Sequence, residues 1–299
     1  MHKIIRVFPT RTAATPDDLL AFSCHGLGKK HVCAVPSMFT PKVDEVHISV
    51  AFSWDCDHAE WLAEQWKHIA PVKIGGPGYS NDPGSSFVPG MYMKNGFVIT
   101  SRGCLNRCWF CSVWKREPSL IELPITDGHI VQDDNLLACS NQHIEAVFQM
   151  LQRQPQRAEL RGLEARLLRE WHIELFLKTR IDSLWFAYDE PDDLEPLVNA
   201  GKLLKAAGFN CNKMYCYVLV GHPKDTMGDA EKRLYRAWKE GFMPFAMLWR
   251  NKKGYRDPEW VTFAWPWCRP AAARSICMKN DMEAEKQKLT TVCRNSLKV

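Results

Sequence analysis

The sequence lacks any long apolar run: none of its 299 residues belongs to a stretch near the ~18 apolar residues that a membrane-spanning helix needs. Residues 1–6 also lack the apolar stretch and small-residue cleavage site of a secretory signal. Low-complexity segments are absent, and 46% hydrophobic with 24% charged residues is a globular composition. We therefore expect a cytoplasmic protein with no membrane contact.

No charge of one sign dominates. The sequence contains 39 Lys and Arg and 34 Asp and Glu residues, which gives a net charge of +5. This mildly basic balance permits an anionic substrate or nucleic acid but argues for neither. The length predicts about two domains. A chain of this length can bury enough of its surface to fold without disulfides. Twelve cysteines therefore need another explanation, and clustered thiols in a cytoplasmic chain indicate a metal.

Three of the twelve cysteines lie close together, and they carry the strongest chemical signal. Cys104, Cys108 and Cys111 are separated by three and then two residues, directly after a predicted strand. Three thiolates on one loop can converge on one soft metal centre. A structural zinc site normally takes four protein ligands, so the group predicts a centre with one open position. Structural zinc is the alternative.

Hydrophobic patterning predicts an α/β fold. A strand over 46–52, a helix over 57–69 and a strand over 71–74 form a βαβ unit, which places a first domain at 1–80. The stretch 81–96 is rich in Gly and Pro and is interpreted as a linker.

A second domain is predicted over 97–250, where strands and helices alternate. Expected strands are 97–101, 129–132, 158–162, 172–176, 184–188, 215–220 and 243–249. Expected helices are 141–152, 192–207 and 228–240. Such alternation predicts an open parallel sheet or a barrel, in which sites collect at the C-terminal ends of strands. Residues 251–299 show no clear repeat and are expected to pack on this domain as an extension.

The cysteine spacing and its place after a strand resemble the radical S-adenosylmethionine (SAM) superfamily. The resemblance implies that Cys104, Cys108 and Cys111 hold three irons of a [4Fe–4S] cluster. The amino and carboxylate groups of SAM then chelate the fourth iron, and Phe110 packs near the adenine. It also implies a partial (β/α)6 TIM-like barrel over 97–250.

The first domain resembles the Rossmann-like module that precedes the barrel in cobalamin-type radical SAM enzymes. Many of those enzymes ligate cobalt through an Asp-x-His-x-x-Gly segment, which this sequence does not contain. Neither His25 nor His58 fits that pattern. We therefore favour a module without cobalamin and keep cobalamin binding as the alternative.

Further strand-end residues agree with the resemblance. Val220, Gly221 and His222 resemble the late strand and turn whose backbone contacts adenine, although an ordinary strand-to-helix turn would look the same. Glu164 and Arg166 end a short predicted strand, where a guanidinium suits the SAM carboxylate because it can bond in a fork. A surface ion pair between these two residues is the alternative.

The glycine-glycine-glutamate segment that binds the SAM amino group in this family is absent. Asp133, Asp134 and Asn135 follow the second strand and are candidates to replace it. Asp189 follows another strand, with helix capping as its alternative role. The acidic balance of these four residues favours a neutral or cationic small molecule or a peptide as substrate, with an extruded nucleic-acid base second.

The resemblance implies that the chain cleaves SAM reductively to a 5′-deoxyadenosyl radical that abstracts hydrogen from a substrate. It also implies an external one-electron donor such as flavodoxin. The alternative is a non-catalytic metal-binding module that contacts nucleic acid through Arg107 and Trp109. The tail cysteines Cys268, Cys277 and Cys293 are widely spaced, so one cluster per chain is expected rather than two.

Overall fold

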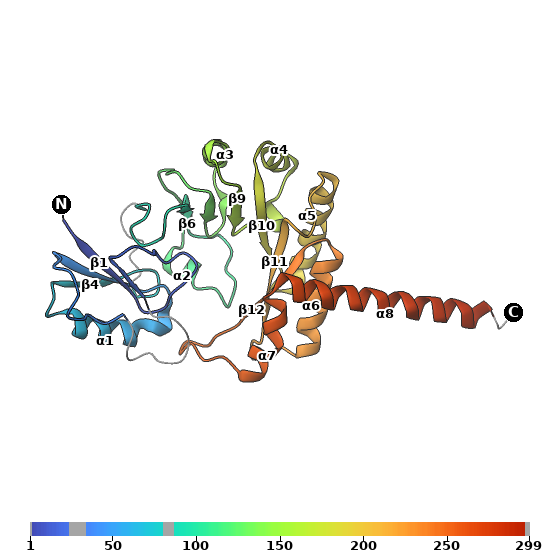
Figure 1. Ribbon diagram of the computed structural model, residues 1–299. Helices are drawn as coiled ribbons and strands as arrows, with labels where there is room; N and C mark the ends of the chain where they lie inside the picture. The colour runs from blue at the N-terminus through green and yellow to red at the C-terminus, as the bar shows by residue number, and fades with distance from the viewer. Residues whose placement is uncertain (1, 24–33, 80–86, 297–299) are drawn as a thin grey trace. The chain divides into compact units, whose positions relative to one another are not determined.

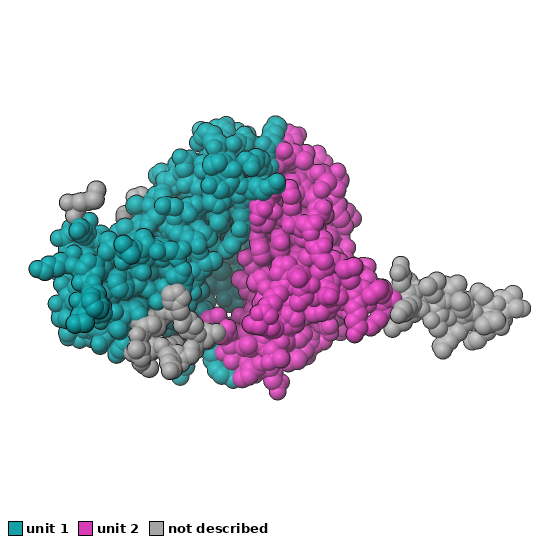
Figure 2. Space-filling view, in the orientation of Figure 1, with its two compact units in different colours: residues 1–162, 178–180, 251–255 teal, residues 163–177, 181–250, 256–299 magenta. Residues whose placement is uncertain are grey.

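A computed structural model describes the backbone of residues 2–23, 34–79 and 87–296, and side chains up to residue 283. The chain is an α/β protein with parallel strands. It divides into two compact units, coloured separately in Figure 2. Unit 1 contains residues 1–162, 178–180 and 251–255, and unit 2 contains residues 163–177, 181–250 and 256–299.

The first sheet of unit 1 has the strand order β2-β1-β3-β4, and every neighbouring pair is parallel. Its strands are β1 (Ile4–Phe8), β2 (Ala21–Ser23), β3 (Glu45–Ser49) and β4 (Val72–Gly75). Helix α1 (Cys56–Trp66) lies along one face of this sheet (Figure 1) and buries Leu62 and Trp66 completely. The predicted βαβ unit is therefore confirmed, whereas β1 and β2 were not predicted.

A buried arginine ties the segment after residue 86 to this sheet. Arg6 lies in β1 and donates to the carbonyl oxygens of Gly90 at 3.0 Å and Met91 at 2.9 Å. Its guanidinium also pairs with Asp18. A buried charge must be paired and hydrogen-bonded, and these three partners satisfy Arg6. Of the predicted linker, residues 81–86 lie outside the described residues.

Unit 1 carries three further parallel strands in the order β9-β8-β5. They are β5 (Phe97–Val98), β8 (Ile130–Gln132) and β9 (Ala158–Arg161). The 3₁₀ turn η2 (Leu136–Ala138) follows β8 and leads to helix α3 (Asn141–Arg153). The hydroxyl of Ser140 caps α3 by accepting the His143 N–H at 3.2 Å. These elements confirm the predicted strands and the helix over 141–152.

Unit 2 repeats the same alternation, with parallel strands in the order β12-β11-β10. They are β10 (Ile181–Ala187), β11 (Met214–Val220) and β12 (Met243–Leu248). Helices α5 (Leu194–Ala206) and α6 (Met227–Lys239) alternate with these strands, as predicted. The Thr226 hydroxyl caps α6 by accepting the Asp229 N–H at 3.1 Å.

The strand predicted over 172–176 is wrong, because these residues lie in helix α4 (Glu170–Lys178). Residues 172–175 alternate polar and apolar side chains, which is typical of a half-buried strand. However, His172, Ile173 and Phe176 are buried at positions i, i+1 and i+4, which lie on one face of a helix. The Arg169 N–H also donates to His172 Nδ1 at 2.9 Å at the start of this helix.

The C-terminal extension is helical, which the sequence did not predict. It contains α7 (Pro258–Trp267) and α8 (Pro270–Ser296). No described helix is both long and apolar enough to cross a bilayer. Asp281 ties α8 to α6, since its carboxylate accepts bonds from the Tyr235 hydroxyl at 2.6 Å, Trp238 Nε1 at 2.8 Å and Lys239 Nζ at 2.9 Å.

We expect Asp281→Ala to lower the free energy of unfolding at pH 7 by about 1–2 kcal/mol, because it removes the acceptor of three hydrogen bonds. Burial alone would raise the pKa of Asp281, but the bonds from Tyr235, Lys239 and Trp238 lower it to about 2. A depressed carboxyl pKa contributes stability above the unfolded pKa of ~4, and this is lost as pH falls through 2.

The measurement is urea denaturation of wild type and variant between pH 7 and pH 2. The difference should shrink as pH falls from about 4 toward 2. Glu283→Ala is the control, since Glu283 is exposed on the same helix and pairs with Lys279 at 3.9 Å. Equal losses for both variants would contradict the role of Asp281.

Candidate functional site

The three clustered cysteines lie on a loop of unit 1 that a short antiparallel ladder closes. The ladder pairs β6 (Ser101–Arg102) with β7 (Ile121–Glu122). Between these strands the chain runs through all three cysteines and the short helix α2 (Val113–Arg116). We call residues 103–120 the cysteine loop. The same ladder holds both ends of the loop, so its 18 residues leave the ladder and return to it.

Asp133 and Asp134, which follow β8, hold the start of the cysteine loop. The Asp133 carboxylate accepts bonds from Thr100 N at 2.6 Å, Thr100 Oγ1 at 2.5 Å and Ser101 Oγ at 2.8 Å. The Asp134 carboxylate accepts the Gly103 N–H at 2.9 Å. Asp133 is only 5% exposed, and burial raises its pKa against the lowering effect of these bonds. These contacts position the loop directly before Cys104.

The backbone at Gly103 requires a glycine. Its φ of +85° is in the left-handed region, and a Cβ there would collide with the Ser119 carbonyl oxygen across the loop. The chain therefore turns sharply at Gly103 and passes close to its own return path. This turn delivers Cys104 immediately after the point that Asp134 holds.

The three cysteines are half-buried, and the sulfurs of Cys104 and Cys111 receive hydrogen bonds from neighbouring groups. Val113 N lies 3.5 Å from Cys111 Sγ, and the Asn135 amide nitrogen lies 3.5 Å from Cys104 Sγ. Burial raises the pKa of the Cys111 thiol, and the charges of Asp134 and Cys104 add to this. No described cysteine of the loop is in a disulfide. Among the described residues, no group of three or more His, Cys, Asp or Glu side chains is arranged to hold a metal ion.

Aromatic and carboxylate side chains complete the loop. Phe110 packs edge-to-face against Trp109, with ring centroids 5.4 Å apart. Trp114 Nε1 donates to the Cys108 carbonyl oxygen at 2.9 Å, which fixes the indole beneath the turn between Cys108 and Cys111. Glu117 is buried, and both this burial and the Asp134 charge raise its pKa.

In unit 2, the strand-end residue Asp189 lies beside the end of β11. Its carboxylate accepts the Leu219 N–H at 2.8 Å. Burial raises the pKa of Asp189 to about 7, in spite of this bond. A carboxyl whose pKa is raised toward neutrality can act as an acid or a base.

The turn after β11 is held by a buried ion pair. Asp225 accepts the Gly221 N–H at 2.9 Å and pairs with Arg233 at 2.8 Å. Arg233 also donates to the Leu219 carbonyl oxygen at 2.9 Å. Gly221 has a φ of +77°, and a Cβ there would press on the Trp260 ring. These contacts fix the backbone conformation at Gly221. In the same turn, His222 Nδ1 lies 3.3 Å from Lys224 N.

The structure does not pair Arg166 with Glu164 through their side chains. The Glu164 carboxylate accepts the Arg166 backbone N–H at 3.2 Å and caps the turn η3 (Ala165–Leu167). The Arg166 guanidinium instead bonds the Asp193 carboxylate at 2.9 Å. Asp193 lies in the turn η4 (Pro191–Asp193) and also accepts the Asp189 N–H at 3.1 Å. The strand-end residues Arg166 and Asp189 are therefore brought together by Asp193.

Sequence reasoning missed Asp193, Asp225 and Arg233 as residues that shape this region. Nothing in the sequence separates a carboxylate that caps a helix from one that binds an arginine. Arg233 lies in α6, eight positions after Asp225, so their pairing depends on how α6 packs against β11.

The other candidate ligands lie in ordinary structural environments. Cys268 donates to the Ala246 carbonyl oxygen at 3.2 Å, and burial raises the pKa of Cys277 to about 12. The side chain of Cys293 and all of His25 lie outside the described residues. His58 is buried on α1, with its ring stacked on Trp61 at 5.8 Å.

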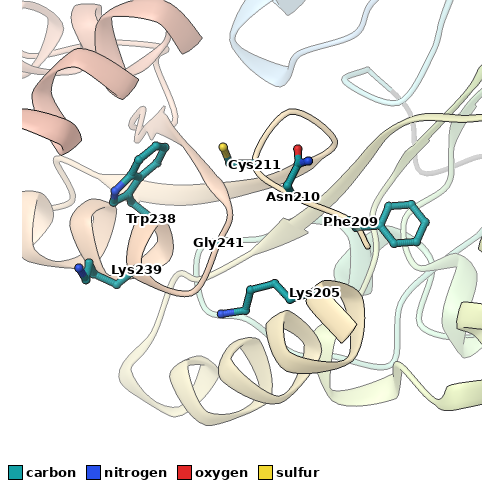
Figure 3. A pocket seen from close by; sticks show the side chains of 7 residues that line it. All are labelled: Lys205, Phe209, Asn210, Cys211, Trp238, Lys239 and Gly241. Carbon is teal, nitrogen blue, oxygen red and sulfur yellow. The ribbon is translucent and has the colours of Figure 1, made fainter. Parts of the chain in front are cut away.

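A cavity of about 320 Å³ in unit 2 contains none of the predicted site residues (Figure 3). It lies at the N-terminal ends of β11 and β12, opposite the strand ends that carry Asp189 and Val220. Trp238 Nε1 and Lys239 Nζ at its wall both donate to Asp281. The lining residues are Lys205, Phe209, Asn210, Cys211, Trp238, Lys239 and Gly241.

Comparison of the sequence with protein-family models and with curated proteins finds no match.

We expect Asp133→Asn to lower the free energy of unfolding by about 2–3 kcal/mol, because an NH₂ group replaces an acceptor and leaves buried donors unpaired. Urea denaturation with a constant m-value would measure this loss. Asp182→Asn is the matched control, because Asp182 is exposed on β10. An equally small effect of both substitutions would contradict the role of Asp133 in holding the loop.

Proposed function

We propose that this chain is a radical SAM enzyme, with the cysteine loop as the binding site for a [4Fe–4S] cluster. In this proposal, residues 1–80 form a Rossmann-like domain and residues 97–250 form a partial (β/α)6 barrel. The parallel strand order of the first sheet and the β–α alternation of the rest support this arrangement. The observation that carries the proposal is one loop with three free thiols, closed by a ladder and held by the carboxylates of Asp133 and Asp134.

The donor set of the loop fits such a cluster. Three thiols are the soft ligands that iron–sulfur clusters use, and a set of three leaves one iron open for SAM. The sulfur of Cys104 receives a hydrogen bond from the Asn135 side chain, and that of Cys111 from the Val113 N–H. Hydrogen bonds of this kind orient the ligands of metal sites. The thiols do not form a ready-made metal site, so ligand binding would draw the three sulfurs together.

When bound, a reduced [4Fe–4S] cluster supplies the electron that cleaves SAM and so starts hydrogen abstraction from a substrate. The chain's own residues hold and shield the reactants. Cys104, Cys108 and Cys111 would bind the cluster, while Asp133 and Asp134 keep the loop in place. Phe110 would pack near the adenine. A donor such as flavodoxin would deliver the electron.

The experiment is anaerobic reconstitution with iron and sulfide, followed by SAM cleavage with a chemical reductant. Wild type should bind about four irons per chain. Replacing Cys104, Cys108 or Cys111 by Ala should abolish both the full iron content and SAM cleavage, because no other side chain there matches thiolate softness.

Cys211→Ala is the matched control, since Cys211 is a half-buried thiol in unit 2. It should leave iron content and SAM cleavage unchanged. A triple Cys104, Cys108 and Cys111 to Ala variant that keeps full iron and activity would overturn the proposal. Tight zinc binding by wild type without SAM cleavage would favour the alternative of a metal-binding module that contacts nucleic acid.

We propose that Arg166 binds the SAM carboxylate. Its guanidinium would then give up part of its hydrogen bonding to Asp193 in order to bond SAM. Arg166→Ala should weaken SAM binding to the reconstituted protein by roughly 10- to 150-fold, which corresponds to about 1.5–3 kcal/mol for a charged hydrogen bond. The free energy of unfolding should change by less than about 1 kcal/mol, because the Arg166 side chain is 46% exposed.

Equilibrium binding of SAM measures this effect, with exposed Arg236→Ala as the control. Unchanged SAM affinity in Arg166→Ala would leave Arg166 with only its ion pair to Asp193.

We place a small molecule or a peptide first as the substrate and an extruded nucleic-acid base second. A radical must be kept from solvent, and this disfavours an open platform for a duplex. The acidic balance of the strand-end residues Asp133, Asp134 and Asp189 favours a neutral or cationic group near the chemistry. Abortive SAM cleavage that is stimulated by tRNA or DNA, but by no metabolite or peptide extract, would reverse this order.

A further inference from the structure

Asn135 makes an unusual contact with the first cysteine of the loop. It follows Asp133 and Asp134, and its side-chain amide nitrogen lies 3.5 Å from Cys104 Sγ. Asn135 is only 2% exposed, whereas Cys104 is half-buried. Three consecutive residues therefore contact the same stretch of chain. The carboxylates of Asp133 and Asp134 accept bonds from its backbone N–H and hydroxyl groups, and the amide of Asn135 contacts the cysteine sulfur.

The orientation of the amide comes at a cost. The Asn135 carbonyl oxygen Oδ1 is buried and has no hydrogen-bond partner among the described residues. An unpaired buried acceptor is destabilising, and each such group in a native protein needs an explanation. The amide nitrogen of the same side chain explains this orientation. A thiolate is a hydrogen-bond acceptor, so it can bond the Asn135 N–H but not Oδ1, which is also an acceptor.

We propose that Asn135 is a positioning residue for the cysteine loop, whose amide N–H bonds the Cys104 thiolate when the loop binds a metal centre. This inference rests on the proposed function of the loop. A hydrogen bond to a ligating sulfur draws electron density from it, which raises the reduction potential of the bound centre. The same bond orients Cys104 toward the other two thiols and so strengthens metal binding.

Two variants of Asn135 separate the amide donor from the shape of the side chain. Asn135→Leu removes both the N–H donor and the unpaired oxygen, so the fold should be kept. Asn135→Asp keeps the shape but replaces the donor by a carboxylate that faces the sulfur. Asn141→Leu is the matched control, because Asn141 is an exposed residue at the start of α3.

The first measurement titrates the metal-free, reduced full-length chain with Co²⁺ under anaerobic conditions and follows the thiolate-to-cobalt charge-transfer absorption. We expect Asn135→Leu to weaken Co²⁺ binding by on the order of tenfold, and Asn135→Asp by more. The charge-transfer band should move to lower energy in both variants, because the sulfur loses its hydrogen bond. Asn141→Leu should match wild type in affinity and band position.

The second measurement is the midpoint potential of the reconstituted cluster, followed by electron paramagnetic resonance. It should be more negative in both Asn135 variants than in wild type and Asn141→Leu. Wild-type affinity, band energy and potential in Asn135→Leu and Asn135→Asp would overturn the role of Asn135 and leave the proposed function standing. A wild-type chain that binds neither Co²⁺ through thiolates nor an iron–sulfur cluster would overturn the proposed function and this inference together.

Discussion

The buried carboxylate of Asp133 is the interaction on which the candidate site depends. A carboxylate that is 5% exposed is costly unless donors surround it, and here Thr100 and Ser101 supply three. Because these donors precede the cysteine loop and the acceptor follows β8, the bonds connect two segments that are more than 30 residues apart. The position of Cys104 is therefore set by the sheet, through Asp133, rather than by the loop itself.

Unit 2 uses carboxylates in the same way at its strand ends. Asp189 accepts the Leu219 N–H, and Asp225 accepts the Gly221 N–H while pairing with Arg233. Backbone N–H groups at the ends of parallel strands have no further strand residue to bond, so acidic side chains satisfy them. Asp189 and Asp225 therefore shape the backbone at these strand ends through their own hydrogen bonds.

Sequence patterns predicted the α/β fold and the βαβ unit, because buried strands and amphipathic helices have different periods. They failed at residues 172–176, where a helix with His172, Ile173 and Phe176 buried also alternates like a strand. The cysteine cluster was visible because its ligands are local in sequence. The contacts of Asp133 to Thr100, of Arg166 to Asp193 and of Arg233 to Asp225 depend on tertiary packing, which no local spacing encodes.

The choice of an amide at position 135 follows from the charges around it. Burial raises the pKa of the Cys111 thiol and the charge of Asp134 adds to this, so a carboxylate already acts on the loop before any thiolate forms. A third consecutive carboxylate at position 135 would repel the Cys104 thiolate at close range in a poorly solvated site. An asparagine keeps the size of aspartate and presents an N–H to the sulfur. The two carboxylates, Asp133 and Asp134, therefore lie beside the hydrogen-bond donors of residues 100–103. The amide of Asn135 lies beside Cys104, whose sulfur becomes negatively charged when it binds a metal.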